Sequence, residues 1–207
     1  MCGVFCKAMT YKLSLFYNMR NEYLTSIIKQ FEYYKMLGDK TFLNIPDEML
    51  FWQYNNESNS IAVIVKHLWG NMLSRWTDFL TTDGEKSWRK RDEEFENDIG
   101  SKDELLKKWN EGWECLFNAL NSLKPEDLDK IIYIRNQGHT VNEAIFRQLA
   151  HYAYHVGQIV YIGKMASEKW VSLSIPKGKS GTFNAEKLAK PRHNEHYTDE
   201  FLKKDKK

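Results

Sequence analysis

Four segments of the chain carry apolar residues every three or four positions, the pattern of a helix with one buried face. This pattern predicts helices at about residues 20–37, 59–80, 101–123 and 141–165. Gly38 stands where a glycine commonly ends a helix, so we expect the first helix to stop there. The residues expected at the centre of the packing are Leu24, Phe31, Leu68, Met72, Trp109, Leu116, Leu149 and Val156. Long helices joined by long connections predict an all-α fold, an antiparallel four-helix bundle.

Capping residues mark the starts of the last two helices. Ser101 and Thr140 each stand three residues before a glutamate, Glu104 and Glu143, which is the capping-box pattern. Between these helices, an apolar run, a turn and a return within residues 131–141 predict a small β-hairpin. The hairpin is the only strand structure that the pattern indicates.

The first residues of the chain differ from the rest. Residues 1–18 lack a sustained helical period, so we expect a poorly ordered N-terminal extension before a bundle domain at residues 19–184. Two other interpretations stay open. The extension packs against or binds something through Cys2 and Cys6, or Met19 is the true start.

The end of the chain is predicted to lack a long helix. Pro176, Gly178 and Gly181 interrupt any helical pattern, which indicates a long segment that wraps around the bundle. Residues 185–207 are rich in charge and are expected to form a flexible tail.

Composition narrows the class of protein. The 30 basic and 28 acidic residues leave a net charge of only +2, which gives no electrostatic basis for binding nucleic acid. Three cysteines do not make a disulfide framework. No apolar run approaches the roughly 20 residues that cross a membrane. We therefore expect a cytoplasmic protein that is not inserted in a membrane.

Three histidines carry the candidate chemistry. His151 and His155 are four residues apart on the most apolar helix, so their rings share one face. His67 lies away from the apolar stripe of its own helix and is the best candidate for a third ligand. Three imidazoles suit a divalent cation and leave a position for water or substrate, as in catalytic sites. The alternative interpretation is a chance pair on one helix and a surface histidine on another.

Polar residues near these histidines are candidate binding groups. Asn71 and Arg75 follow His67 at intervals of one helical turn, and Gln148 and Gln158 lie one turn on either side of the histidine pair. They can orient metal ligands or bind a polar substrate, or they form ordinary polar helix surface.

The connection at residues 81–98 also offers charged groups. Arg89, Arg91 and Asp92 either close over the cleft and grip a carboxylate, or belong to a solvated loop. Cys115 lies beside an apolar stripe and is interpreted as a small core residue.

Several motifs together resemble a known family. They are NSIAVIVKHLWGNM around His67, HYAYHVGQI from His151, DGEKSWRKRDEEF at residues 83–95 and SLSIPKGKS at residues 172–180. Over about residues 20–184 the chain resembles the DinB-like superfamily, and in particular a less characterised subfamily from Gram-positive bacteria. The resemblance implies a metal-binding four-helix bundle, often dimeric, with His67, His151 and His155 as the metal ligands.

The resemblance also sets the expected function. Relatives include thiol-dependent S-transferases, so we expect a transferase that uses a divalent metal, zinc (Zn) or nickel (Ni), to activate a low-molecular-weight thiol of the bacillithiol type toward an electrophile. A non-catalytic metal-binding or stress-response protein and a metal-dependent hydrolase are the alternatives. No glutamate adjoins the histidines in sequence, which disfavours hydrolysis. A homodimer is expected from the resemblance and from the seven Trp and eleven Phe.

Overall fold

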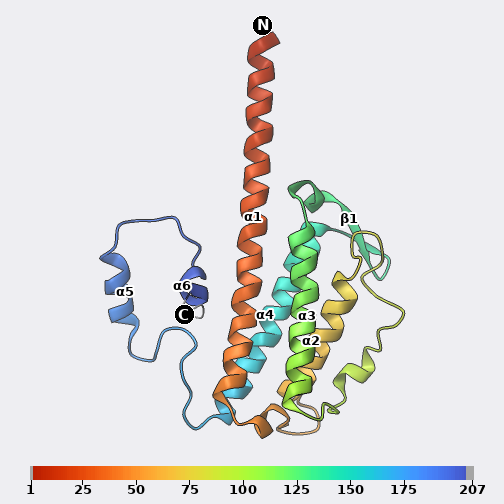
Figure 1. The fold of residues 1–207 in the computed structure, drawn as a ribbon, viewed down its shortest axis with the longest axis vertical. Helices are drawn as coiled ribbons and strands as arrows, with labels where there is room; N and C mark the ends of the chain where they lie inside the picture. The colour runs from red at the N-terminus through yellow and green to blue at the C-terminus, as the bar shows by residue number, and fades with distance from the viewer. Residues whose placement is uncertain (1, 204–207) are drawn as a thin grey trace.

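The computed structural model describes the backbone of residues 2–203 and the side chains of residues 14, 15 and 17–203. Four long helices lie side by side, with a two-stranded hairpin at one end of the bundle (Figure 1). The prediction of an all-α bundle is confirmed. The elements in chain order are α1 (Cys2–Asn44), η1 (Asp47–Leu50), α2 (Ile61–Trp76), η2 (Asp92–Phe95), α3 (Lys102–Ser122), η3 (Pro125–Asp129), β1 (Ile131–Ile134), β2 (Gln137–Thr140), α4 (Val141–Ala166), α5 (Ser180–Leu188) and α6 (Asp199–Leu202).

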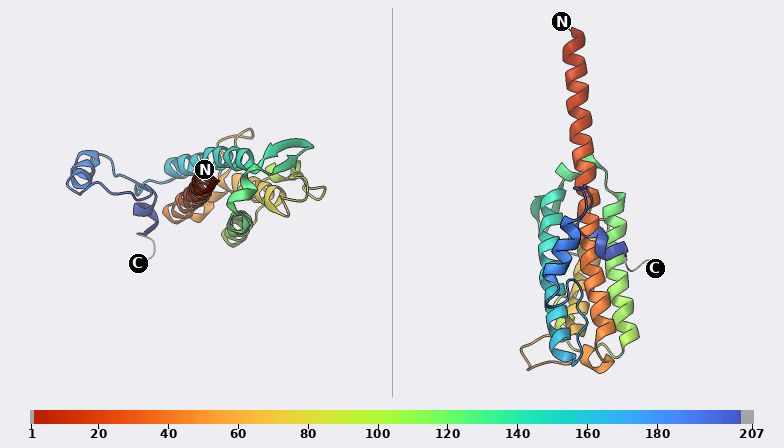
Figure 2. Two further views of the ribbon diagram at one scale, coloured as in Figure 1. Left: turned by 90° about the horizontal axis from the view of Figure 1, so that it is seen from above. Right: turned by 90° about the vertical axis from the view of Figure 1, so that its left-hand side faces the viewer.

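The helices run in two directions. Helices α1 and α4 run one way and helices α2 and α3 run the other way, as the two further views also show (Figure 2). Helices α2 and α3 are parallel neighbours. The connection that links them, residues 77–101, must therefore carry the chain back along the length of the bundle. The bundle is thus antiparallel in that the pair α1 and α4 runs opposite to the pair α2 and α3.

The caps and the hairpin form where the sequence predicts them. The hydroxyls of Ser101 and Thr140 accept hydrogen bonds from the backbone N–H groups of Glu104 and Glu143, and α3 and α4 begin at the next residues. Strands β1 and β2 pair antiparallel. The two-residue turn between them, Arg135–Asn136, has positive φ at both positions, as a type I′ hairpin turn requires.

Helix α1 differs from the prediction at both of its ends. It is continuous from Cys2 to Asn44, so the expected stop at Gly38 is wrong. A Cβ at Gly38 would lie 2.4 Å from Trp109 Cζ2, so this glycine permits close packing on α3 instead of ending the helix. The N-terminal part of α1 projects beyond the other helices (Figure 1), so the residues there do not need an apolar stripe. The side chains of Cys2 and Cys6 lie outside the described residues.

The core lies between the four helices. Of the eight positions expected there, seven are buried and Leu149 is partly buried. The core also holds a polar bridge: the indole N–H of Trp76 donates to the hydroxyl of Tyr152, which donates to Oδ1 of Asn71, each at 3.0 Å. Because Asn71 faces the candidate site, this bridge connects the core to that site.

The C-terminal segment returns to α1. His196 lies 2.9 Å from Ser26 Oγ, Lys29 pairs with Asp199 at 2.8 Å, and Thr198 is fully buried. The expected tail therefore contains a segment that packs on the bundle, beside α1 (Figure 2).

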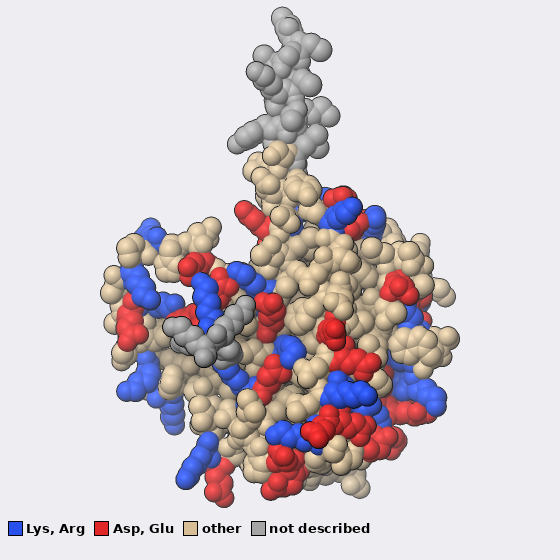
Figure 3. Space-filling model, viewed as in Figure 1, with Lys and Arg blue, Asp and Glu red and all other residues tan. Residues whose placement is uncertain are grey.

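The charge on the surface and the polarity of the helices agree with the composition. Basic and acidic side chains are interspersed on the face shown in Figure 3, in keeping with the small net charge. Among the described residues, no helix is both long enough and apolar enough to cross a membrane.

Candidate functional site

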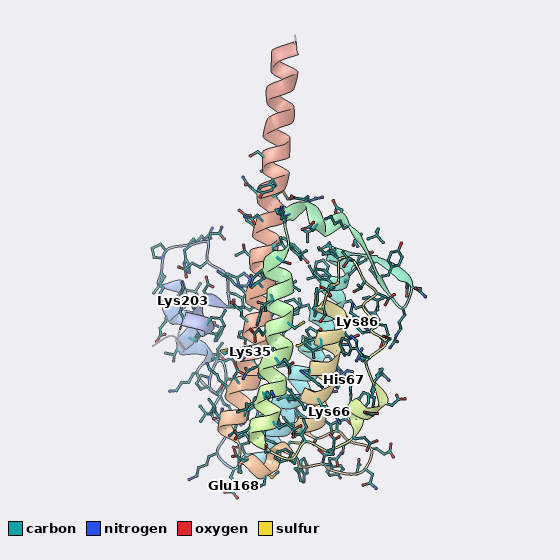
Figure 4. The ribbon with its side chains drawn as sticks, turned by 45° about the vertical axis from the view of Figure 1, so that its right-hand side comes forward. Lys35, Lys66, His67, Lys86, Glu168 and Lys203 are labelled. Carbon is teal, nitrogen blue, oxygen red and sulfur yellow. The ribbon has the colours of Figure 1, made fainter. Side chains whose placement is uncertain are left out.

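The three predicted histidines meet in the interior of the bundle. His67 projects from α2 (Figure 4), and His151 and His155 project from α4, one turn apart. One ring nitrogen of each can be chosen so that all three lie within 4.8 Å of one another. His67 is only 5% exposed, because the polar side of α2 is buried and not solvated.

The spacing of the rings suits one bound cation. Nε2 of His67 and Nε2 of His151 are 3.3 Å apart. Two imidazole nitrogens on a tetrahedral zinc ion, each at 2.0–2.1 Å, would be roughly 3.4 Å apart. Two lone pairs that face each other at this distance need a proton or a metal ion between them.

The ring of His67 is held from behind by Glu94. Nδ1 of His67 lies 2.9 Å from Oε2 of Glu94, which leaves Nε2 to face the other histidines. Glu94 is 4% exposed and is itself fixed by Arg89, whose Nε and Nη2 donate at 2.7 and 2.9 Å. A carboxylate behind a ligating imidazole fixes its tautomer and raises its basicity.

Glu94 was missed from the sequence because it is 27 residues from His67 and lies in the charged connection. The signal for it was Gly70 on α2. A Cβ at Gly70 would lie 2.2 Å from Oε1 of Glu94, so only glycine leaves room for the carboxylate. No spacing rule joins these two positions, since the contact depends on the path of the connection.

His155 has a comparable support. Its Nδ1 lies 2.9 Å from Oε1 of Gln158, one turn further along α4. Gln158 therefore orients a candidate ligand, one of the two roles expected for it, and does not line the cavity described below. Two of the three imidazoles thus have their far nitrogen engaged by a side chain.

The histidines on α4 are held neutral. Burial lowers the pKa of His151 to about 3, and the nearby His155 and His67 act in the same direction. Burial also lowers the pKa of His155. For Glu94, burial favours the neutral acid, but hydrogen bonds from His67 and Arg89 outweigh it and lower the pKa of the carboxyl. Neutral imidazoles beside an ionised carboxylate are the protonation states that metal binding requires.

A cavity of about 230 Å³ adjoins the histidine cluster. Asn71, Arg75 and Gln148, all expected near the site, lie in its wall. The other lining residues are His67, His151, Arg89, Arg91, Arg135 and Arg147. Arg89 and Arg91 of the charged connection therefore line the cavity, whereas Asp92, which was grouped with them, does not.

Cys115 and the other three histidines lie elsewhere. Cys115 is outside the cavity and burial raises the pKa of its thiol, which suits a structural residue. His139 lies on β2, His196 contacts Ser26, and His193 contacts a backbone carbonyl in the C-terminal segment. None of these groups joins the histidine cluster.

Comparison with known proteins gives one family. The family described as "Protein of unknown function (DUF1572)" matches residues 18–179, and the chain belongs to this family. This span includes the three histidines, Glu94 and every residue of the cavity wall, and it ends before α5. No curated protein and no solved structure matches the chain.

Proposed function

We propose that this member of the DUF1572 family is a metal-dependent transferase of the DinB-like superfamily that activates a low-molecular-weight thiol toward an electrophile. His67, His151 and His155 hold one divalent cation, zinc or nickel. The observation that carries the proposal is the convergence of three imidazoles, two of which are oriented by a side chain on the far nitrogen.

The three imidazoles are suitable ligands for the proposed cation. Neutral imidazoles are good ligands for zinc and nickel. Among the described residues, no fourth histidine, cysteine or carboxylate joins the three, and a cavity opens beside them. When bound there, the cation supplies Lewis acidity that favours a thiolate over a thiol at neutral pH.

The protein's own residues position and shield the reactants. Glu94 and Gln158 keep two imidazoles in one orientation, and Tyr152 orients the amide of Asn71 toward the cavity wall. The cavity wall contains no cysteine, which supports a thiol that arrives with a small molecule. Glu94 and Gln158 thus act on the metal ligands, while Asn71 is available to contact the reactants.

Hydrolysis is less well supported. A metal-dependent hydrolase needs a carboxylate or histidine that is free to take a proton from water. Both oxygens of Glu94 accept hydrogen bonds from Arg89, and one also faces His67, so this carboxylate is occupied. A storage or sensor protein, the other alternative, has no need of a polar cavity beside the metal.

We also propose that two copies of the chain form a homodimer. Phe146, Tyr154 and Tyr161 follow one another at intervals of about two helical turns on α4 and are each more than half exposed. Exposed aromatics aligned on one helix face support an interface between two copies.

Elemental analysis of purified protein, followed by a thiol-conjugation screen with metal present and removed, tests the function. We expect about one zinc or nickel per chain, and conjugation only in the loaded protein. His155→Ala should lose the metal while the bundle still folds, and His193→Ala, in the exposed C-terminal segment, is the matched control. Bound metal at the wild-type ratio in His155→Ala would exclude the shared site. Conjugation that is unchanged after metal removal would exclude the transferase mechanism.

A further inference from the structure

The cavity beside the histidines has an unusual charge. Five arginines line it, from four separate parts of the chain: Arg75, Arg89, Arg91, Arg135 and Arg147. Among the described residues, only Glu85 and Glu94 form ion pairs with any of them, so the group holds three more cations than anions. Asp83, the next carboxylate in the connection, is occupied by backbone N–H groups of the hairpin turn. Like charges gathered in a partly enclosed space repel one another unless an anion enters.

Three of the arginines, Arg75, Arg89 and Arg135, are oriented by ion pairs. Glu85 accepts from both terminal nitrogens of Arg75 at 3.1 Å and from Nε of Arg135 at 3.0 Å. Arg89 is 1% exposed in its side chain and is fixed by Glu94. A binding site whose cations are already oriented loses less conformational entropy when its ligand arrives.

The other two arginines, Arg91 and Arg147, have no carboxylate partner among the described residues. Arg91 lies over the ring of Phe95, and Nη1 of Arg147 lies 3.4 Å from Nε2 of His139. Both side chains are exposed at the rim of the cavity, where they are free to turn toward a ligand.

Two buried polar atoms in the wall also lack partners. Nε of Arg75 has no acceptor and Oε1 of Gln148 has no donor among the described residues. The two residues are only 7% and 3% exposed. A buried polar atom without a partner is unfavourable, and a bound ion or ligand is one explanation for it. The site therefore offers one anion-binding donor and one acceptor that needs a hydroxyl or an N–H group.

We propose that this cavity binds the head group of a substrate that carries two negative charges on oxygen, a phosphate monoester or a dicarboxylate, with a hydroxyl next to it for Gln148. The cavity of about 230 Å³ has room for such a head group. Arginine forks match the paired oxygens of both kinds of anion. The inference rests on the proposed function in one respect: it assigns the class of substrate that meets the metal site.

Binding is measured on metal-stripped, full-length protein by calorimetry at constant ionic strength. The probes are glycerol phosphate, methyl phosphate, succinate and acetate. We expect a dianion to bind at least tenfold more tightly than acetate, and the ratio of phosphate to succinate identifies which anion is preferred. Glycerol phosphate should bind more tightly than methyl phosphate, and Gln148→Leu should remove that difference.

Arg147→Gln is the central variant, because Arg147 is exposed and we expect its loss to leave the fold intact. It should weaken dianion binding about tenfold, whereas Lys90→Gln, which removes an exposed cation close to the rim, should not. Equal affinities for dianions and acetate, or unchanged dianion binding in Arg147→Gln, would overturn the proposal. Because no metal is present, dianion binding can succeed while the transferase fails, or fail while the metal site stands.

Discussion

Replacing Glu94 by glutamine tests whether the carboxylate behind His67 strengthens metal binding. Removal of a histidine ligand does not test this. The change keeps the size of the side chain and removes only its charge and one acceptor. Glu94 does not touch the proposed cation, so any loss of metal affinity must be transmitted through His67. We expect Glu94→Gln to bind zinc about 10- to 100-fold more weakly than the wild type.

The geometry explains the magnitude. Oε1 of Glu94 accepts from Nε of Arg89 at 2.7 Å, and Oε2 accepts from Nη2 of Arg89 at 2.9 Å. In either orientation, the amide nitrogen of a glutamine would therefore face an N–H donor of Arg89. If the amide nitrogen occupied the position of Oε2, it would also face Nδ1 of His67. It would then favour the tautomer of His67 with the proton on Nε2, and a protonated Nε2 cannot bind a metal.

A tenfold to hundredfold loss corresponds to about 1.4–2.7 kcal/mol of binding free energy. The folded protein should also lose stability, since a charge-assisted hydrogen bond to Arg89 contributes roughly 1.5–3 kcal/mol. Metal affinity and the free energy of unfolding must therefore be measured separately. Affinity is obtained by competition with a chromophoric chelator, and stability of the metal-free protein is obtained by urea titration.

Glu93→Gln is the matched control, because Glu93 is the preceding residue, is 63% exposed in its side chain and, among the described residues, forms an ion pair with Lys90 alone. It should change neither quantity by more than about 0.5 kcal/mol. If Glu94→Gln folds and binds zinc as tightly as Glu93→Gln does, the carboxylate does not tune the site, and its proposed action through His67 is refuted.

The same contacts lead to four further predictions. Gly70→Ala should displace the carboxylate and weaken metal binding about tenfold, whereas Gly157→Ala, with nothing within 4 Å of its Cβ, should keep the affinity and gain about 1 kcal/mol of stability in urea titrations. The pKa of His151 is about 3 in the fold against an ordinary value of 6.5, so the unfolded chain binds more protons below pH 6.5. The metal-free protein should thus lose about 1 kcal/mol between pH 7 and 5, after allowance for solvent screening, and a flat urea-derived profile would contradict this. Deletion of residues 1–18 should leave the unfolding temperature nearly unchanged, and deletion of residues 190–207 should lower it by several degrees because buried contacts on α1 are lost. Light scattering at micromolar concentration should give twice 24.6 kDa, and a monomer mass would exclude the dimer.

The helices and the histidine cluster could be predicted from the sequence because both depend on local periodicity. A 3.6-residue period states which face of a helix is buried, and an interval of four places two rings on one face. The position of His67 off its apolar stripe was also informative. It fits a residue that faces a cleft, and in the structure this side of α2 is covered by the charged connection, which contacts Ser74 and Arg75.

The errors came from contacts between distant segments. Gly38 is a common helix stop in sequence, but here its missing side chain makes room for Trp109. The charge of residues 185–207 suggested a solvated tail, yet Thr198 is buried and Asp199 pairs with Lys29. In each case a residue whose local preference is clear serves a tertiary contact, which no local pattern records.

The path of the chain explains why part of the site comes from a loop. Since α2 and α3 are parallel, residues 77–101 must return along the bundle, and they do so on the polar face of α2. Their contacts follow α2 in reverse order: Gly84 meets Ser74, Glu94 meets His67, and Asn97 meets Ser60. Along this path the connection delivers Glu85 and Glu94 to the arginines of the cavity and Glu94 to the histidine cluster. The polar face of α2 is thus buried by the same segment that completes the site, so a change that detaches the connection should weaken metal binding and anion binding together.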